Sequence, residues 1–173
     1  MTELRPLTFH GNFPHALDDK GRLMLPVVLR DELHRVSEIP DRLYLSYFPS
    51  NRHLTVYTFE KWKEQSAAWS DENRFPSTKV RVAAQRLFFS NIEMVIMDKA
   101  GRILIPANYR ERIGLVPSQK VIINGNCGRI EIWAPEEFLA NESKDLDLFK
   151  EAMDFDAQRG VQSIQETGRL PEW

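Results

Sequence analysis

An internal repeat is the feature that most constrains how this 173-residue chain can fold. The stretch HALDDKGRLMLPVVLRDEL, which starts at His15, aligns with VIMDKAGRILIPANYRERI, which starts at Val95. The two stretches share the pattern D-x-x-G-R-[LI]-x-[LI]-P-x-x-x-R-x-x-[LI] at an offset of 80 residues. Residues 54–62 also align with residues 130–138, at an offset of 76. Because a fixed period is typical of duplicated structural units, we predict two copies of one unit of about 50 residues.

The repeated pattern predicts a turn, a strand and a helix in each copy. The glycine gives the backbone freedom for a tight turn, and the aspartate before it can accept backbone N–H groups. Alternating apolar residues after the glycine are typical of a half-buried strand, and the proline that follows suits the first position of a helix. Two hairpins are then expected, one over residues 44–57 and the other over residues 120–133, with the second turning at Asn124-Gly125-Asn126.

A unit of this size has too little core to be stable alone, so we expect the two copies to share one. The expected fold is α+β and rich in strands, a small barrel or sandwich with short helices after each unit. The predicted segments are unit 1 at 11–62, a connecting helical segment at 63–89, unit 2 at 90–138, and a C-terminal helix with a polar tail at 139–173. Pro76-Ser77-Thr78 is expected to open a helix through Phe89, and Ser143 to cap another through Phe155.

Catalytic and metal sites are not expected. The four histidines lack metal-binding spacing, Cys127 has no histidine in its half of the chain, and no nucleophile or phosphate-loop motif is present. We therefore predict no enzyme activity, catalytic residue, metal, cofactor or small-molecule substrate. No apolar stretch approaches the ~20 residues of a membrane span, and residues 1–10 lack the apolar run of a secretory leader. A cytoplasmic protein without membrane contact is expected.

The charge distribution allows a local basic face. The formal net charge is −2, but residues 141–173 hold 8 acidic and 4 basic side chains, so the remainder is net +2. Arg22 and Arg102 leave the two turns on the side opposite the apolar face, and Lys20 and Lys99 add charge there. A guanidinium can clamp a phosphate or contact guanine. Alternatively, each arginine pairs with the aspartate of its own turn and braces it, and the two roles are compatible.

The arginines of the predicted helices, Arg30 and Arg110, recur at the same offset. Their long apolar stems and their position after the proline favour packing and local pairing over ligand binding.

These motifs resemble the MraZ family, bacterial transcriptional regulators with two SpoVT-AbrB-type units in tandem. The resemblance rests on Phe9-His10-Gly11 and on the two D-x-x-G-R-x-x-x-P motifs, and it extends from about Phe9 to Phe155. It implies an AbrB-like swapped-hairpin barrel built by both units and a ring-shaped homo-oligomer. It also implies binding to double-stranded DNA at repeated elements upstream of the division and cell-wall gene cluster, and hence association with the nucleoid.

The resemblance also implies roles for individual residues. The family's Asp-x-x-Gly-Arg turn carries DNA binding, which assigns this role to Arg22 and, by repeat symmetry, to Arg102. Lys20 matches a basic position of the family before the glycine, and we add Lys99 as a secondary DNA contact. By the turn chemistry given above, Asp18, Gly21, Asp98 and Gly101 shape the turns. Two other functions stay open from the residues: an antitoxin-like barrel that binds a protein partner, and an assembly protein whose oligomer is its function.

Overall fold

The computed structural model describes residues 8–48 and 50–167, with side chains described as far as residue 155. The chain divides into two bodies, residues 1–135 and residues 136–173. Every described strand lies in the first body, and a single helix makes up the described part of the second. No helix in the described part of the chain is long and apolar enough to cross a membrane.

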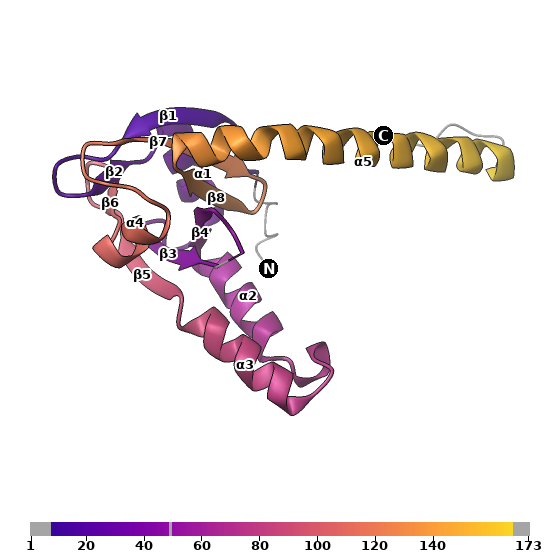
Figure 1. The fold of residues 1–173 in the computed structure, drawn as a ribbon, viewed down its shortest axis with the longest axis horizontal. Helices are drawn as coiled ribbons and strands as arrows, with labels where there is room; N and C mark the ends of the chain where they lie inside the picture. Colours follow the sequence, from indigo (N-terminus) through magenta and orange to yellow (C-terminus); the bar gives the residue numbers. More distant parts are fainter. Residues whose placement is uncertain (1–7, 49, 168–173) are drawn as a thin grey trace. The chain divides into compact units, whose positions relative to one another are not determined.

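The two halves of the chain have the same order of elements (Figure 1). The first half contains β1 (Asn12–Ala16), β2 (Arg22–Met24), α1 (Val27–Val36), β3 (Arg42–Tyr47), β4 (His53–Thr58) and α2 (Phe59–Ser70). The second half contains β5 (Ile92–Ile96), β6 (Arg102–Leu104), α4 (Ala107–Arg112), β7 (Lys120–Asn126), β8 (Arg129–Trp133) and α5 (Pro135–Thr167). Between them lie a short 3-10 helix (Glu72–Arg74) and α3 (Thr78–Phe89).

The two halves exchange strands. The main antiparallel sheet has the order β1-β7-β8-β4-β3-β5, so the first strand of each half pairs with the hairpin of the other. Strands β4 and β8 join the halves at the centre, and β2 pairs with β6 in a second, two-stranded sheet. The expected α+β class with antiparallel sheets is therefore confirmed. Among the described strands, β1 and β5 are the edges of the main sheet, so strand pairing by itself does not close it.

Both halves contribute equivalent residues to one core. Leu23 and Leu25 from the first half and Ile103 and Ile105 from the second are fully buried. The residues between them are more exposed, which is the alternation expected of a strand with one buried face. The apolar stripes of α1 and α4 cover this core through Leu29, Leu33, Tyr109 and Ile113.

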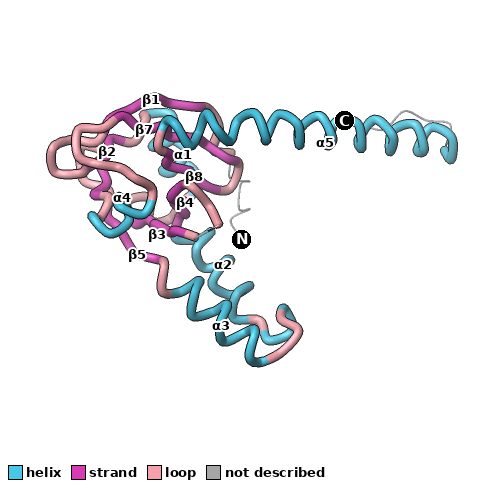
Figure 2. The backbone as a smooth tube through the Cα atoms, in the orientation of Figure 1, coloured by secondary structure: helices cyan, strands magenta, loops and turns pink. Residues whose placement is uncertain are grey.

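Helices α2 and α3 lie side by side as a helical hairpin (Figures 1 and 2). Helix α3 opens at Ser77-Thr78, as predicted, and the Ser77 hydroxyl caps it by accepting a hydrogen bond from the Val80 N–H at 3.3 Å. Phe88 is buried in the hairpin, with its ring centroid 5.7 Å from that of Trp62 and 4.5 Å from that of Trp69. These aromatic contacts fix α3 against α2.

Two sequence-based expectations are wrong. The last helix does not begin after Ser143 but at Pro135, because proline suits a first helical turn and Glu136 and Glu137 favour its positive end. It is also longer than the short helix expected: it continues through residues predicted as a polar tail to Thr167, and residues 168–173 lie outside the described chain.

The second hairpin turns later than predicted. Strand β7 continues through Gly125 to Asn126, and the turn is Cys127-Gly128, where Cys127 has a φ of 52°. Gly125 stays in the strand because the backbone of His10 passes over it. A Cβ at this position would lie 2.4 Å from the His10 nitrogen.

Candidate nucleic-acid interface

The turn between β1 and β2 is built around the Asp18 carboxylate. One oxygen, Oδ1, accepts hydrogen bonds from the backbone N–H groups of Lys20 (2.9 Å) and Arg22 (2.8 Å). The other, Oδ2, accepts one from Arg22 Nε at 2.6 Å. Gly21 has a φ of 76°, a conformation in which a Cβ is strained. The carboxylate therefore fixes both the turn and the direction in which the arginine leaves it.

The turn between β5 and β6 repeats this geometry. Asp98 Oδ1 accepts hydrogen bonds from the backbone N–H groups of Ala100 (2.9 Å) and Arg102 (3.0 Å), and Oδ2 accepts one from Arg102 Nε (2.8 Å). Gly101 has a φ of 82°. Ala100 stands where the first turn has Lys20, and Lys99 stands where it has Asp19, so each turn has one lysine before its glycine but at a different position.

Hydrogen bonding lowers the pKa of both aspartates below the ordinary value of 3.8. The largest cause in each turn is the backbone N–H of the arginine, and its guanidinium adds to the effect. Both carboxylates are thus charged at neutral pH. The structure contains the bracing pair that the sequence suggested in both turns.

The two turns stand at opposite ends of the antiparallel pair of β2 and β6, each beside the end of the other strand. Arg22 lies opposite Leu104, and Met24 lies opposite Arg102. Since opposite residues of an antiparallel pair point to the same side, Arg22 and Arg102 share the outer face, while Leu23 and Ile103 fill the inner one. Their side chains are 31% and 34% exposed.

Two reciprocal backbone hydrogen bonds lock this arrangement. The Leu25 N–H donates to the Gly101 carbonyl at 2.9 Å, and the Ile105 N–H donates to the Gly21 carbonyl at 3.0 Å. Each turn is thereby tied to the strand end of the other half.

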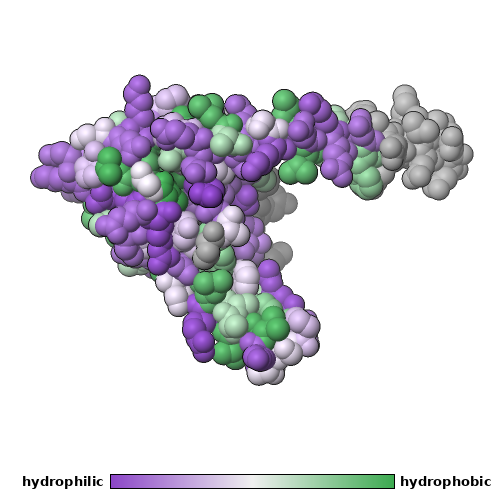
Figure 3. All heavy atoms as spheres, viewed as in Figure 1, coloured by the Kyte–Doolittle hydropathy of each residue, from purple (hydrophilic) through white to green (hydrophobic). Residues whose placement is uncertain are grey.

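Lys20 and Lys99 are exposed within the turns. Figure 3 shows hydrophilic residues gathered at the end of the first body where β1 passes into β2. The two arginines share one face of the β2–β6 pair and are partly covered, and the two lysines are open to solvent within their turns.

Sequence reasoning missed a contact between the helix arginines and the turns. Arg110 of α4 lies against Gly21, and Arg30 of α1 lies against Gly101, so each arginine reaches the turn of the other half. The signal available was that the glycine and the arginine recur together at the same offset in both copies. That signal does not say which arginine meets which glycine, because the crossing follows from strand exchange.

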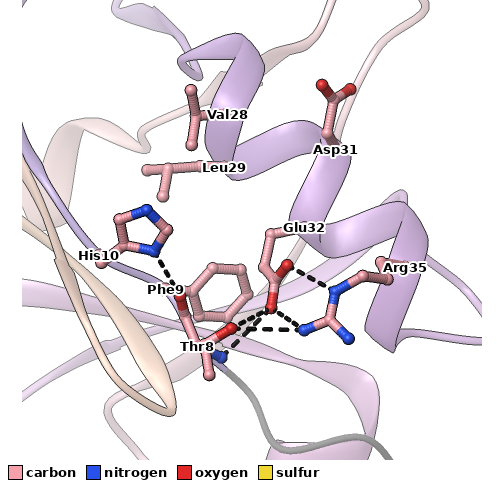
Figure 4. A pocket seen from close by; sticks show the side chains of 8 residues that line it. All are labelled: Thr8, Phe9, His10, Val28, Leu29, Asp31, Glu32 and Arg35. Carbon is pink, nitrogen blue, oxygen red and sulfur yellow. Dashed lines mark hydrogen bonds and ion pairs between the residues drawn. The ribbon is translucent and has the colours of Figure 1, made fainter.

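A separate concave site lies beside α1 (Figure 4). Its volume is about 240 Å³, and its lining includes Phe9, His10, Val28 and Leu29. Glu32, Arg35 and Thr8 point toward one another, whereas Asp31 points away from them. Glu32 accepts hydrogen bonds from the Thr8 N–H (3.2 Å), the Thr8 hydroxyl (2.8 Å) and Arg35. The carboxylate is thus occupied by bonds that attach residue 8 to α1.

No group of three or more His, Cys, Asp or Glu side chains in the described chain is arranged to hold a metal ion.

Comparison with known proteins supports a regulatory role. Residues 88–159 match a family model described as the MraZ protein, antitoxin-like. The chain is 36% identical over 155 residues to the transcriptional regulator MraZ of Oleidesulfovibrio alaskensis, covering 90% of this chain and 97% of the relative. It is 33% identical over 153 residues to that of Heliobacterium modesticaldum, covering 86% and 99% of the two chains. Because these relatives are transcriptional regulators, the expectation that the chain is not an enzyme is confirmed.

Gly21 must adopt a positive φ and must also leave room for Arg110. A comparison with Gly114, which meets only the first requirement, separates the two. Both have positive φ, 76° and 70°, but a Cβ on Gly21 would lie 2.8 Å from Arg110 Nε, whereas none of the described atoms surrounding Gly114 comes within 4 Å of its Cβ. We expect Gly114→Ala to lower the free energy of unfolding by the ~1–2 kcal/mol of backbone strain. Gly21→Ala should lower it further, as measured by urea denaturation. Equal losses would show that Arg110 moves aside without cost.

The Glu32 cluster should make stability depend on acidity. The side-chain hydrogen bond from Arg35, with those from Thr8, lowers the pKa of Glu32 from 4.5 to about 2. A lowered carboxyl pKa adds stability that is complete above the unfolded-state value and is lost as the pH falls toward the folded-state value. We expect the free energy of unfolding to decrease between about pH 4.5 and pH 2, and Glu32→Gln to reduce that decrease. An unchanged slope in the variant would contradict this assignment.

Proposed function

The chain belongs to the MraZ family of transcriptional regulators, and we propose that it binds double-stranded DNA through the outer face of β2 and β6. The observation that carries this proposal is the placement of Arg22 and Arg102 on one exposed face, each oriented by an aspartate of its own turn. Diagonal neighbours on such a strand pair have Cβ atoms typically about 7–8 Å apart, so two guanidinium groups can approach one duplex together.

Arg22 and Arg102 are the proposed primary contacts, with Lys20, and Lys99 as a secondary one. The Asp18 carboxylate binds Arg22 through Nε, and the terminal nitrogens of Arg22 donate no hydrogen bond to another described residue. Those nitrogens form the planar fork that suits a phosphate or the edge of guanine. The two lysines add sequence-independent attraction to the backbone. Asp18, Gly21, Asp98 and Gly101 shape the turns.

We further propose that the units are residues 11–62 and 90–138, joined by residues 63–89, and that together they form a swapped-hairpin barrel. The strand exchange supports this arrangement. The two-stranded sheet would close the open side, because β2 continues from β1 through the bridge between Leu17 and Leu23 and pairs with β6, which continues from β5.

Assembly into a ring would compensate for the acidic net charge. A ring presents many Arg22 and Arg102 faces to one duplex, and linkage of weak contacts raises the overall affinity. We propose repeated elements upstream of the division and cell-wall gene cluster as the target, since repeated sites match repeated subunits. Binding there places the protein at the nucleoid.

The proposed contact between subunits is made by the exposed apolar residues of α3 and β5, together named the α3–β5 surface. Its members, each between 38% and 56% exposed, are Val80, Val82, Leu87, Phe89, Met94 and Ile96. Figure 3 shows hydrophobic residues gathered over the α2–α3 hairpin. Because β5 is also an edge strand, this surface offers both apolar area and unpaired backbone groups to a second copy of the chain.

Arg22→Ala tests the DNA contact. We expect it to weaken binding to the DNA directly upstream of the gene by about 5- to 150-fold, the effect of losing a contact of ~1–3 kcal/mol. The salt dependence should also become shallower, and the melting temperature should stay nearly unchanged. Gel shifts at 50 and 200 mM salt measure both, with the exposed Lys144→Ala as the control. If Arg22→Ala unfolds the protein instead, the arginine is a brace and the proposed contact is wrong.

Light scattering tests the assembly. We expect a mass several times 20.2 kDa for the natural chain. Leu87→Glu should reduce it, because a charge on a buried apolar contact is costly, whereas Val28→Glu, at an exposed residue of α1 outside the α3–β5 surface, should not. A monomeric natural chain would remove the ring, and an unchanged mass for Leu87→Glu would place the contact elsewhere.

A further inference from the structure

Two arginines that point across the boundary between the units contact the proposed DNA-binding turns. A Cβ on Gly21 would lie 2.8 Å from Nε and 3.0 Å from Cζ of Arg110, which belongs to α4 of the second unit. A Cβ on Gly101 would lie 2.5 Å from Cδ and 2.6 Å from Nη1 of Arg30, which belongs to α1 of the first unit. Each guanidinium group therefore packs where a side chain would otherwise be.

The two contacts are held in different ways. Arg110 Nε donates a hydrogen bond to the Ile105 carbonyl at 3.0 Å, at the end of its own strand β6. The N–H of the same residue, Ile105, donates a hydrogen bond to the Gly21 carbonyl. Arg30 Nε is buried and has no hydrogen-bond partner in the described chain, so packing alone holds it against Gly101. Arg110 is thus the better anchored of the two.

We propose that Arg110 positions the turn that carries Arg22, and that Arg30 positions the turn that carries Arg102. This rests on the proposed function, in which those turns contact DNA. A planar guanidinium lying on a glycine limits the movement of the turn, and the absent Cβ is what allows the close approach. Each DNA-binding turn is then assembled from both units, and an isolated unit lacks a part of its own site.

The helix arginines also change the local charge. The residues 18–22 and 98–102 together carry a formal charge of +1, and Arg30 and Arg110 raise the total for this region to +3. A charge of this size attracts DNA from any direction, so a general loss of affinity does not distinguish positioning from simple attraction. The pairing between particular residues does distinguish them.

Double-mutant cycles test the crossed pairing. The variants are Arg22→Ala, Arg102→Ala, Arg30→Met and Arg110→Met, since methionine keeps an apolar stem without the guanidinium. The probes are a duplex of the DNA directly upstream of the gene and a scrambled duplex of the same length and composition. We expect Arg110→Met to weaken binding of the upstream duplex strongly when Arg22 is present and hardly at all when Arg22 is alanine. The coupling factor in Kd should be about 3- to 30-fold.

The same result is expected for Arg30 with Arg102. The mismatched pairs, Arg110 with Arg102 and Arg30 with Arg22, are the controls and should be additive. The proposal would be overturned if coupling appeared in the mismatched pairs. It would also be overturned if every pair were additive and each helix variant had a shallower salt dependence of binding. The latter outcome would mean that Arg30 and Arg110 contact phosphates themselves.

Arg110→Lys separates shape from charge and covers the case in which Arg110→Met does not fold. Lysine keeps the charge but not the planar group, so we expect it to leave the binding defect largely in place. Full recovery with lysine would overturn the positioning role.

A readout without DNA separates this inference from the proposed function. Gly21→Ala should destabilise the chain less in the Arg110→Met background than in the natural one, because the clash is removed, whereas Arg30→Met should give no such relief. If the natural chain fails to bind DNA, the proposed function is wrong, but this stability cycle still reports the crossed contact. If the natural chain binds DNA and both cycles are additive, the positioning role is wrong.

Discussion

Two reciprocal hydrogen bonds, from the Leu25 N–H to the Gly101 carbonyl and from the Ile105 N–H to the Gly21 carbonyl, are the constraint on which the rest of the structure depends. A buried backbone group without a partner costs free energy, so each strand end needs the turn of the other unit to be folded. The pairing of β2 with β6 then sets Leu23 and Ile103 inward and the two turn arginines outward. The core and the proposed binding face both follow from one strand register. A slip of one residue would turn the apolar side chains outward and the arginines inward.

The arrangement of charged side chains around the two turns, more than the net charge, explains how an acidic chain can present basic side chains on one face. Asp18 and Asp98 each neutralise part of the arginine beside them, Asp18 at Nε of Arg22 and Asp98 at both Nε and Nη2 of Arg102, and both also accept backbone hydrogen bonds. The carboxylates therefore act as supports that fix side-chain direction, which would lower the entropy lost in the proposed contact with DNA. The positive surplus comes from Lys20, Lys99 and the crossing arginines.

The repeat predicted the local structure well, because a turn, an alternating strand and a proline-initiated helix depend on residues close in sequence. The chemistry around Asp18 and Gly21 followed from spacing in the same way. The exchange of β1 and β5 could not be predicted from the residues alone, since each strand pattern fits the hairpin of either unit equally well. Arg110 packs and pairs locally, as expected, through its hydrogen bond to Ile105, but its packing partner Gly21 could not be predicted for the same reason, because it belongs to the other unit. The turn at Cys127 was missed because Gly125 serves a close backbone approach and not a bend.

Joining both units in one chain has a physical consequence for binding. The exchanged strands are tethered, so the complete face forms within one chain, at a loop-closure cost that does not depend on protein concentration. The proposed assembly contact uses α3 and β5, whereas the proposed DNA contact uses β2 and β6, so the two proposals fall on different elements of the first body. Tethering also allows the turns to differ, with Lys20 in one and Ala100 in the other, while the crossed glycine–arginine contacts hold both in the same backbone shape. The chain can thus present two chemically distinct turns on one rigid support, which a symmetric pair of identical chains cannot do.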